Sequence, residues 1–414
     1  MKQPMLRFKA DDGSDFPDWE EKTLGNEGRF YGGLSGKDKK DFETGDACFV
    51  TYMNVYKNPF ARQDMMGCVS VGAGEKQNKV LYGDLLFTQS SETVEEVGLS
   101  SVYLHDDEPY LNSFCMGYRF NNPKEVCHKF IGYCMRSDRV RKSIMPMGQG
   151  ISRINLSSKR LGTVSFHIPS LPEQRKIADL LSTVDNVIAA QQAEVDAWKQ
   201  RKKGAMQKLF SQEVRFKADD GSDFPDWEEK TLGELCAPLT YGMNAAATRF
   251  DGENRYIRIT DIDDETHAYL SDDVVSPEGH LDDKYIVGNG DILLARTGAS
   301  TGKSYLYHSK DGKLFYAGFL IKAHVLSSSD DYFVYSQTLT DKYWKWVKMT
   351  SMRSGQPGIN ANEYASYSFA VPSLPEQHKI ADCLSSIDDV IVKARAELTK
   401  WQELKKGLVQ QMFV

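Results

Sequence analysis

Two long segments of this 414-residue chain place apolar side chains at alternating spacings of four and three residues. The segments begin after Pro172 and Pro375, and proline suits the first turn of a helix because no N–H is left unpaired there. Such spacing over several heptads is typical of a coiled coil. We therefore predict one long helix in residues 167–212 and another in residues 370–414. Each would have about 38 residues and a length of roughly 57 Å.

The seam of the predicted coiled coil is formed by the positions that repeat at this spacing. They are Ile177, Leu181, Val184, Ile188, Val195 and Trp198 in the first helix, and Ile380, Leu384, Ile387, Ile391, Leu398 and Trp401 in the second. An amphipathic helix on a globular core is the alternative, but it predicts a wider apolar face and a shorter element. We expect the helices to run antiparallel, because a two-fold axis that exchanges two modules also reverses their helices. Trp198 is then expected near the start of the second helix.

The segments before the helices show short β-like runs interrupted by Gly and Asp. Phe49–Val55 resembles Tyr256–Ile262, Gly83–Thr88 resembles Gly290–Ala295, and residues 147–151 resemble residues 354–359. These patterns predict an α+β protein in which two homologous mixed α/β domains are joined by an antiparallel coiled coil, with pseudo-two-fold symmetry. A P-loop-like stretch, Gly298–Ser304, has only three residues between its glycines and precedes a β-like run, which argues against phosphate binding at a helix N-terminus.

Internal repeats divide the chain into two modules. Residues 7–25 recur letter for letter as residues 215–233, and we call 6–25 and 214–233 the acidic blocks. Pro-Ser-Leu-Pro-Glu-Gln at 169–174 recurs at 372–377, followed in both copies by Lys-Ile-Ala after one residue. The predicted domains are 1–166 and 213–369, each followed by a repeat helix, 167–212 or 370–414. If the object is a closed two-fold ring, Phe413–Val414 lie beside Met5–Leu6 as Phe210 lies beside Val214.

Charge and composition constrain the function without fixing it. Each acidic block carries three basic and six acidic side chains within its repeated stretch, so the two blocks account for nearly all of the net charge of −7. A locally basic surface for nucleic acid is therefore compatible with the total charge. Seven cysteines without a CxxC pair indicate a cytoplasmic protein with reduced thiols and no zinc site. No membrane segment, resident metal or paired catalytic constellation is expected.

The repeated blocks carry a resemblance to a known family. Pro-Ser-Leu-Pro-Glu-Gln with a long helix behind it, the Gly-Asp-Leu-Leu or Gly-Asp-Ile-Leu strands, and the Trp-Glu-Glu-Lys-Thr-Leu-Gly stretch resemble the specificity (S) subunits of type I restriction-modification systems. The resemblance covers essentially the whole chain. It implies that each variable segment is a target recognition domain that reads one half of a split, asymmetric DNA site, and that the helices are a spacer.

The resemblance also implies the partners. Double-stranded DNA, two methyltransferase (M) subunits and restriction (R) subunits would bind this non-catalytic chain. S-adenosylmethionine, ATP and magnesium would bind those partners, with no cofactor on this chain. The seam residues would belong to the partner-docking helices. Two rivals stay open: a fused restriction or modification enzyme, which would need catalytic motifs, and an interaction protein such as a coiled-coil adaptor or an anti-restriction decoy.

Polar and cationic side chains in the variable segments are the candidates for DNA contact. The stretch from Arg296 to Lys303 suits this role because Arg reads guanine edges and Ser, Thr and Lys hold phosphates, although a solvated hairpin is the alternative. The full set is Arg62, Gln89, Ser90, Ser91, Arg141, Lys142, Gln149, Tyr241, Asn244, Arg249, Arg296, Thr297, Ser300, Thr301, Lys303, Arg353 and Gln356.

Overall fold

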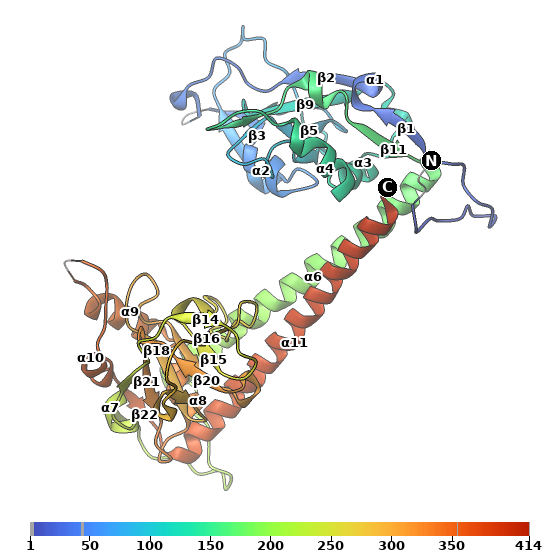
Figure 1. Ribbon diagram of the computed structural model, residues 1–414. Helices are drawn as coiled ribbons and strands as arrows, with labels where there is room; N and C mark the ends of the chain where they lie inside the picture. Colours follow the sequence, from blue (N-terminus) through green and yellow to red (C-terminus); the bar gives the residue numbers. More distant parts are fainter. Residues whose placement is uncertain (1–3, 43–44, 354, 414) are drawn as a thin grey trace. The chain divides into compact units, whose positions relative to one another are not determined.

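The computed structural model describes residues 4–42, 45–353 and 355–413. It divides into two compact units, Met1–Ala193 with Arg395–Val414 and Glu194–Ala394. Each unit therefore combines one variable segment with part of both long helices, α6 (Leu171–Phe210) and α11 (Leu374–Met412) (Figure 1). The predicted helices are thus present, with 40 and 39 residues.

The first unit is built from short elements before α6. Its strands are β1 (Glu20–Thr23), β2 (Gly28–Gly32), β3 (Ala47–Val50), β4 (Met66–Val69), β5 (Leu85–Thr88), β6 (Ser90–Ser91), β7 (Ser100–Val102), β8 (Tyr110–Leu111), β9 (Cys115–Phe120), β10 (Ile154–Asn155) and β11 (Ser165–Ile168). Its helices are α1 (Leu24–Glu27), α2 (Tyr52–Lys57), α3 (His128–Met135), α4 (Asp138–Ile144) and α5 (Ser158–Leu161), with 3-10 turns η1 (Lys39–Phe42), η2 (Gln63–Met65), η3 (Pro123–Glu125) and η4 (Met145–Met147).

The second unit has a similar series. Its strands are β12 (Glu228–Thr231), β13 (Thr240–Tyr241), β14 (Ala247–Arg249), β15 (Arg255–Ile257), β16 (Val275–Pro277), β17 (Ile286–Val287), β18 (Asp291–Ala295), β19 (Ser304–Leu306), β20 (Leu314–Tyr316), β21 (Leu320–His324) and β22 (Ser368–Val371). Its helices are α7 (Leu232–Leu235), α8 (Asp331–Gln337), α9 (Asp341–Thr350) and α10 (Ala361–Ala365), with 3-10 turns η5 (Ile259–Asp261), η6 (Asp283–Tyr285) and η7 (Ser309–Asp311).

A four-stranded antiparallel sheet forms the framework of each unit. The strand order is β2-β9-β5-β7 in the first unit and β13-β21-β18-β19 in the second. Figure 1 shows α3 and α4 on one side of the first sheet, where Phe130 and Ile131 join a buried cluster with Leu85 and Phe87. The same architecture in both units confirms the predicted α+β class and the internal duplication.

The Gly-Asp motif before each central strand is a tight turn. Gly83 and Gly290 have φ of 86° and 81°, a region that favours glycine. The Asp84 carboxylate accepts the Leu81 N–H, and the Asp291 carboxylate accepts the Gly288 N–H, each at 2.8 Å. The motif therefore fixes how the chain enters β5 and β18, and these predicted strands are confirmed.

The β-like run predicted at Phe49–Val55 is only half correct. Strand β3 ends at Val50 and helix α2 begins at Tyr52, because the Thr51 side chain accepts the Asn54 N–H as a helix cap. The second copy changes in the same place, where β15 ends at Ile257 and a 3-10 turn follows. A local cap has therefore overridden the β propensity of both runs.

Each acidic block is fastened to the start of its long helix by a buried ion pair. Arg7 donates to both oxygens of Glu173 at 3.0 and 2.7 Å, and Arg215 donates to Glu376 at 3.1 and 2.8 Å. The two glutamate side chains have no exposed surface, whereas the arginines are 21% and 24% exposed. The glutamate of the repeated Pro-Glu-Gln sequence is therefore a structural anchor.

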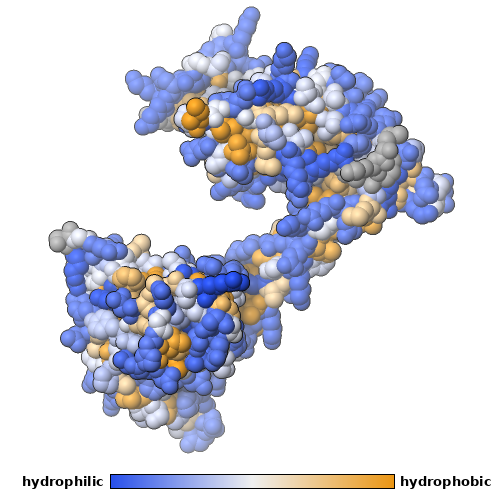
Figure 2. Space-filling model, viewed as in Figure 1, coloured by the Kyte–Doolittle hydropathy of each residue, from blue (hydrophilic) through white to orange (hydrophobic). Residues whose placement is uncertain are grey.

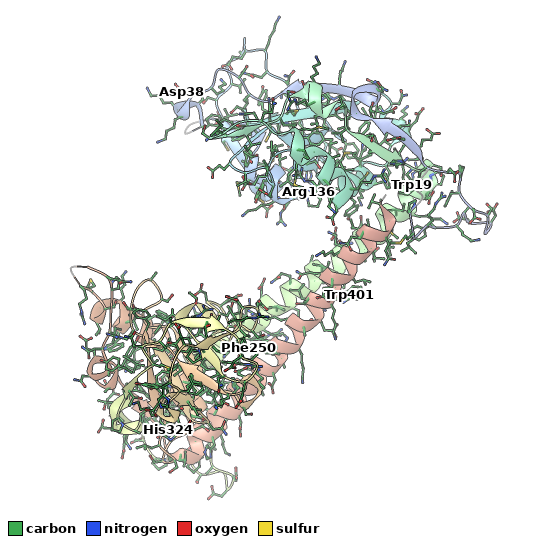
Figure 3. The ribbon with its side chains drawn as sticks, in the orientation of Figure 1. Trp19, Asp38, Arg136, Phe250, His324 and Trp401 are labelled. Carbon is green, nitrogen blue, oxygen red and sulfur yellow. The ribbon has the colours of Figure 1, made fainter. Side chains whose placement is uncertain are left out.

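The aromatic part of the first block packs into the core. Trp19 is buried and meets Phe130 and Phe413 edge-on, with ring centroids 5.8 and 6.5 Å apart (Figure 3). Its copy Trp227 is only half-buried and packs against Phe333 at 6.2 Å. The identical sequence thus packs a tryptophan ring against a phenylalanine ring in both units, and this ring is more deeply buried in the first.

The helices run antiparallel within each unit. In the first, Ile177 and Leu181 of α6 share a core with Met412 at the end of α11. In the second, Met206 and Leu209 of α6 share a core with Ile380 and Leu384 at the start of α11, which confirms the antiparallel prediction.

The position predicted for Trp198 is wrong. Lys202 pairs with Asp388, which lies about four turns after the start of α11. Because the helices are antiparallel, Trp198, one turn before Lys202 in α6, lies opposite a position about five turns after the start of α11. Trp198 therefore lies opposite the middle of α11.

A Lys–Asp–Tyr group repeats where the helices meet the globular part. In the first unit Lys405 lies 2.6 Å from Asp185, and the Tyr133 hydroxyl donates to the other oxygen of Asp185 at 2.7 Å. In the second unit Lys202 and Tyr332 both donate to Asp388. Burial raises the pKa of both tyrosines, which keeps the phenols protonated as donors.

We expect Asp185→Asn to lower the free energy of unfolding by about 1–2 kcal/mol, because it removes the charge partner of Lys405 and one hydrogen-bond acceptor. Urea denaturation of the full chain followed by circular dichroism measures this loss. The matched variant Asp388→Asn should give a similar loss. Two unchanged midpoints would show that the groups contribute no stability.

The ends of the first unit meet as the two-fold ring predicts. The Leu6 N–H donates to the Gln411 carbonyl at 3.1 Å, and in the second unit the Val214 N–H donates to the Lys208 carbonyl at 3.2 Å. These contacts are equivalent under the offsets of the two repeats. The prediction is confirmed to the extent that Leu6 meets the last turn of α11 at Gln411, while Val414 lies outside the described residues.

Candidate nucleic-acid interface

The same backbone arrangement forms the end of the central strand in both units. After β5, the Gln89 N–H donates to the Phe114 carbonyl at 2.8 Å, and the Leu156 N–H donates to the Gln89 carbonyl at 2.9 Å. After β18, Arg296 makes the equivalent bonds with Phe319 and Ile359, at 3.0 and 2.9 Å. We call these the recognition edges. They comprise residues 89–91, 114 and 149–156 in the first unit, and residues 296–298, 319 and 356–359 with Tyr241 in the second.

The edge of the second unit presents a guanidinium over an aromatic ring. Arg296 is half-buried, and its Cζ lies 4.9 Å from the centre of the Tyr241 ring. One Arg296 nitrogen donates weakly to the Gly318 carbonyl at 3.4 Å, and the Tyr241 hydroxyl accepts the Ala361 N–H at 3.1 Å. Phe319 beside them is 61% exposed. A stacked guanidinium with further N–H groups is suited to a planar acceptor such as a guanine edge.

The edge of the first unit carries different side chains on the same frame. Gln89 and Ser90 are half-buried, Phe114 is 47% exposed, and Arg153 lies 5.1 Å from the Phe114 ring centre. Gln149 is exposed, and its backbone pairs with Asn155 in both directions at 2.9 and 2.8 Å. This edge therefore offers an amide, a hydroxyl and a cation beside an exposed ring.

The structure corrects the predicted match of residues 147–151 with 354–359. The bonds to Gln89 and Arg296 make Leu156 equivalent to Ile359, so Gln356 corresponds to Arg153 and not to Gln149. The glycines that flank Gln149 and Gln356 had suggested that these two glutamines are equivalent, and this alignment is wrong. Thr297, like its counterpart Ser90, lies in the paired backbone, opposite Gly358.

Three side chains missed from the sequence belong to the edges: Phe114, Phe319 and Arg153. The two phenylalanines share a signal that was available. Each stands directly before the strand that neighbours the central one, at β9 and β21. Arg153 gave no such signal, since its neighbours show no repeat. Figure 2 shows that the visible surface is mostly hydrophilic with scattered hydrophobic patches.

Several predicted contacts are engaged inside the fold. Arg141 is buried and donates to the carbonyls of Glu95 and Val97 at 2.9 and 3.0 Å, and burial lowers its pKa to about 10. It is therefore a structural cation that braces the segment after the first edge. Its Nη1 is buried without a hydrogen-bond partner, so a base contact by Arg141 would require the side chain to leave this buried position.

Lys303, Thr301 and Ser91 are corrected for the same reason. Lys303 is buried, donates to the Ile262 carbonyl at 2.9 Å and pairs with Asp264. The Thr301 hydroxyl donates to the Gly298 carbonyl at 2.7 Å, and the buried Ser91 hydroxyl lies 2.6 Å from the Tyr52 hydroxyl. Buried groups with satisfied hydrogen bonds have little capacity left for DNA. Ser300 is half-buried, and its carbonyl closes the turn before β19.

Other predicted residues stay at the surface. Lys142, Asn244, Arg249 and Gln356 are exposed. Arg62 is exposed but bonded through two nitrogens to Asp64 at 2.9 and 2.6 Å, and Arg353 pairs with Glu363 at 2.5 Å. An exposed ion pair contributes little stability, so both arginines can exchange their partner for a phosphate at low cost.

The seam residues line the two helices as their spacing requires. Ile177, Leu181, Val184, Val195, Ile380, Leu384, Ile391 and Leu398 are buried, whereas Ile188, Trp198, Ile387 and Trp401 are half-buried. Trp401 is labelled on α11 in Figure 3. Among the described residues no three His, Cys, Asp or Glu side chains are placed to hold a metal ion. In the same part of the chain no helix is long and apolar enough to cross a membrane.

Comparisons with known proteins agree with this duplicated architecture. A family model described as Type I restriction modification DNA specificity domain matches residues 18–197 and again residues 225–400. The Type I restriction enzyme MjaVIII specificity subunit of Methanocaldococcus jannaschii is 26% identical over 283 residues, which is 64% of this chain and 64% of that relative. The chain thus spans just under two thirds of that relative's length. The Type I restriction enzyme StySPI specificity subunit of Salmonella potsdam is 22% identical over 380 residues, covering 87% of this chain and 80% of the relative.

Solved structures share the fold. The S subunit of a type I restriction-modification system from M. genitalium matches with a TM-score of 0.58 at 16% identity, covering 100% of this chain and 99% of that one. A chain from a study of complex assembly in a type I R-M system matches with a TM-score of 0.55 at 14% identity, covering 96% and 98%.

Proposed function

Because this chain belongs to the Type I restriction modification DNA specificity family, we propose that it reads a bipartite DNA sequence for a type I restriction-modification complex. Each unit contacts one half of an asymmetric double-stranded site through its recognition edge. The chain itself performs no catalysis in this proposal.

The observation that carries the proposal is the equivalence of the two edges. Two backbone hydrogen bonds are the same in both units, while the side chains presented there differ. Gln89 in the first unit takes the place of Arg296 in the second, and Arg153 takes the place of Gln356. One frame with two sets of donors and acceptors is what reading two different half-sites requires. Exposed Phe114 and Phe319 add apolar surface that suits thymine methyl groups or the sugar edge.

Contacts with phosphates position the chain and contacts with bases specify the sequence. Exposed cations such as Lys142 and Arg249 are suited to phosphate contacts, whereas Arg296 is held by Tyr241 in a fixed orientation that suits a base. The surface ion pairs of Arg62 and Arg353 belong to the first group. This division predicts which substitutions change specificity and which change affinity alone.

The long helices are proposed as spacer and docking scaffold. α11 keeps large apolar side chains at the surface of each unit, Val392 at 59% and Leu404 at 46% exposure. Two methyltransferase (M) subunits and restriction (R) subunits are the proposed partners. S-adenosylmethionine, ATP and magnesium would bind those partners and supply methyl transfer and cleavage there.

We expect Arg296→Ala to relax discrimination at one base pair of the second half-site by about 1–3 kcal/mol, because it removes the stacked guanidinium. The test is binding of the assembled chain and M subunits to duplexes with each base pair of the site replaced in turn. Arg296→Lys is the matched control, since it keeps the charge and loses the planar donors.

The outcomes separate three roles. Specificity lost in both variants identifies a base contact. Affinity lost equally for all duplexes in the alanine variant alone, with a shallower salt dependence, identifies a phosphate contact. Unchanged binding in both variants would contradict a DNA-binding role of Arg296. It would favour the alternative that the loop after Arg296 is a solvated hairpin.

A further inference from the structure

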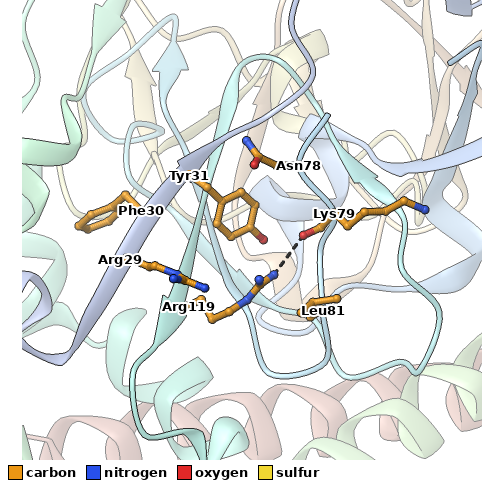
Figure 4. Close-up of a pocket in the computed structure, with 7 residues that line it drawn as sticks. All are labelled: Arg29, Phe30, Tyr31, Asn78, Lys79, Leu81 and Arg119. Carbon is orange, nitrogen blue, oxygen red and sulfur yellow. Dashed lines mark hydrogen bonds between the residues drawn. The ribbon is translucent and has the colours of Figure 1, made fainter. Parts of the chain in front are cut away.

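A cavity of about 240 Å³ in the first unit has three cations among its seven lining residues. Arg29, Lys79 and Arg119 contribute to its wall together with Phe30, Tyr31, Asn78 and Leu81 (Figure 4). A water molecule occupies about 30 Å³ of liquid, so the cavity has room for a tetrahedral oxyanion with some hydration.

The two arginines stand directly opposite each other in the sheet. Arg29 of β2 is the register partner of Arg119 of β9 in an antiparallel pair. Like charges directly opposite on neighbouring strands destabilise a sheet. A carboxylate compensates only one of them, because Asp84 accepts from Arg119 at 2.8 and 2.6 Å.

Arg29 is left without a counter-charge. It is exposed and has no hydrogen-bond or ion-pair partner among the described residues. The Lys79 ammonium lies 4.7 Å from the centre of the Tyr110 ring and has no carboxylate partner within the same part of the chain. The group therefore holds three cations against one carboxylate, an arrangement that stabilises an added anion.

The wall of the cavity is fixed in advance. Arg119 also donates to the Lys79 carbonyl at 3.1 Å and lies over the Tyr31 ring at 5.3 Å. The Tyr31 hydroxyl donates to Asp84 at 2.6 Å, and burial raises the pKa of Tyr31, which keeps this donor protonated. The hydrogen bonds with Asp84 raise the pKa of Arg119 and keep its guanidinium charged. Asn78 is tied by its amide to the Gly32 carbonyl at 3.0 Å. Because Nε and Nη2 of Arg119 are bonded to Asp84 and the Lys79 carbonyl, its Nη1 and the Arg29 guanidinium are the charged donors left for phosphate oxygens.

The second unit does not repeat this site. Its counterpart of Arg119 is His324, which bonds to Asp291 at 2.8 Å. Next to His324 the neighbouring chain is Ala237, whose N–H donates to the His324 carbonyl at 2.8 Å, followed by Pro238, and neither residue carries a charge. The cation pair is therefore a feature of the first unit alone.

We propose that this cavity is a phosphate-binding site, and that its phosphate belongs to the backbone of bound DNA. Arg119 lies five residues along β9 from Phe114, about 17 Å at 3.4 Å per residue. A duplex that is read at the first recognition edge can therefore meet the cavity with a flanking phosphate. This source of the phosphate rests on the proposed function, whereas the anion site itself does not.

Titration of the full chain with inorganic phosphate in a non-phosphate buffer tests the site directly. Calorimetry should show saturable binding that Arg29→Gln weakens at least about tenfold, because a charge-assisted contact is removed. Arg139→Gln changes the same charge at another exposed position of the unit and should leave this binding unchanged. No saturable heat, or equal binding in the Arg29→Gln variant, overturns the site.

The salt dependence of DNA binding tests the source of the phosphate. In the assembled complex, Arg29→Gln should make the slope of log affinity against log salt shallower by about one and leave the preferred sequence unchanged. An unchanged slope, with phosphate binding lost, overturns the DNA assignment and identifies a free phosphate compound as the ligand. Phosphate binding measured on the chain alone is independent of sequence reading, so failure of the proposed function would not imitate failure of this site.

Discussion

Replacing residues 26–166 with the corresponding segment of a relative is expected to change one half of the methylated DNA sequence completely and to leave the other half unchanged. The physical reason is that Gln89, Phe114 and Arg153 all lie inside this segment, whereas the acidic block and α6 lie outside it. The junctions are close in space. The Gly25 N–H donates to the Gly162 carbonyl at 2.8 Å, and Lys22 is the register partner of Phe166.

Methylome sequencing of cells that express the hybrid with its M subunits measures the outcome. The reciprocal exchange of residues 234–369 is the matched control and should change the opposite half only. A hybrid with a new sequence in both halves would show that the two units read DNA jointly. Loss of all methylation in a folded hybrid would place partner docking inside the exchanged segment.

Replacing Glu173 with alanine is expected to lower the free energy of unfolding by about 3 kcal/mol. This carboxylate has no exposed surface and accepts two hydrogen bonds from Arg7, so its removal takes the buried charge partner away from a guanidinium that keeps only its bonds to nearby carbonyls and its contact with Asp18. The estimate lies at the low end for buried pairs because Arg7 keeps 21% exposure and can recruit water.

The chain contains its own control for this effect. Glu376→Ala breaks the equivalent pair with Arg215, so it should cost a similar amount. Urea denaturation followed by tryptophan fluorescence suits the measurement, since Trp227 donates to Glu376 at 3.2 Å and Trp19 lies in the equivalent block. Arg7→Lys, which keeps the charge and loses the two-nitrogen contact, should have an intermediate effect. A loss below about 1 kcal/mol in both glutamate variants would mean that the repeated glutamate is not an anchor.

The helices and the Gly-Asp strands could be predicted because their signals are local. The four-three spacing defines α6 and α11 to within a few residues. Each central strand is preceded by a glycine, which has a positive φ in the structure. The antiparallel direction followed from the duplication alone. The position of Trp198 could not be predicted from the duplication, because it depends on the register of one helix against the other. That register is determined by pairs such as Lys202 with Asp388.

The candidate interface was predicted less well because burial of long side chains is decided by distant residues. Arg141 looked like a surface cation, yet its partners Glu95 and Val97 lie more than forty positions earlier in the chain. Lys303 is held in the same way by Ile262. By contrast, the half-buried position of Arg296 could be expected from the sequence, because it follows a buried strand directly, at the point where the chain leaves a sheet for the surface.

The bond between Leu6 and Gln411 has a consequence for the gene. The same bond joins Val214 to Lys208, so one contact is made between segments that are adjacent in sequence in the second unit and far apart in sequence in the first. A coding sequence that places the second module before the first would therefore specify a chain with the same fold. A coding sequence for one module alone would encode both segments that form this contact. Two identical products would then form a dimer in which each chain contributes one module. Such a dimer would read an inverted repeat, which makes duplication and fusion a direct route from symmetric to asymmetric DNA targets.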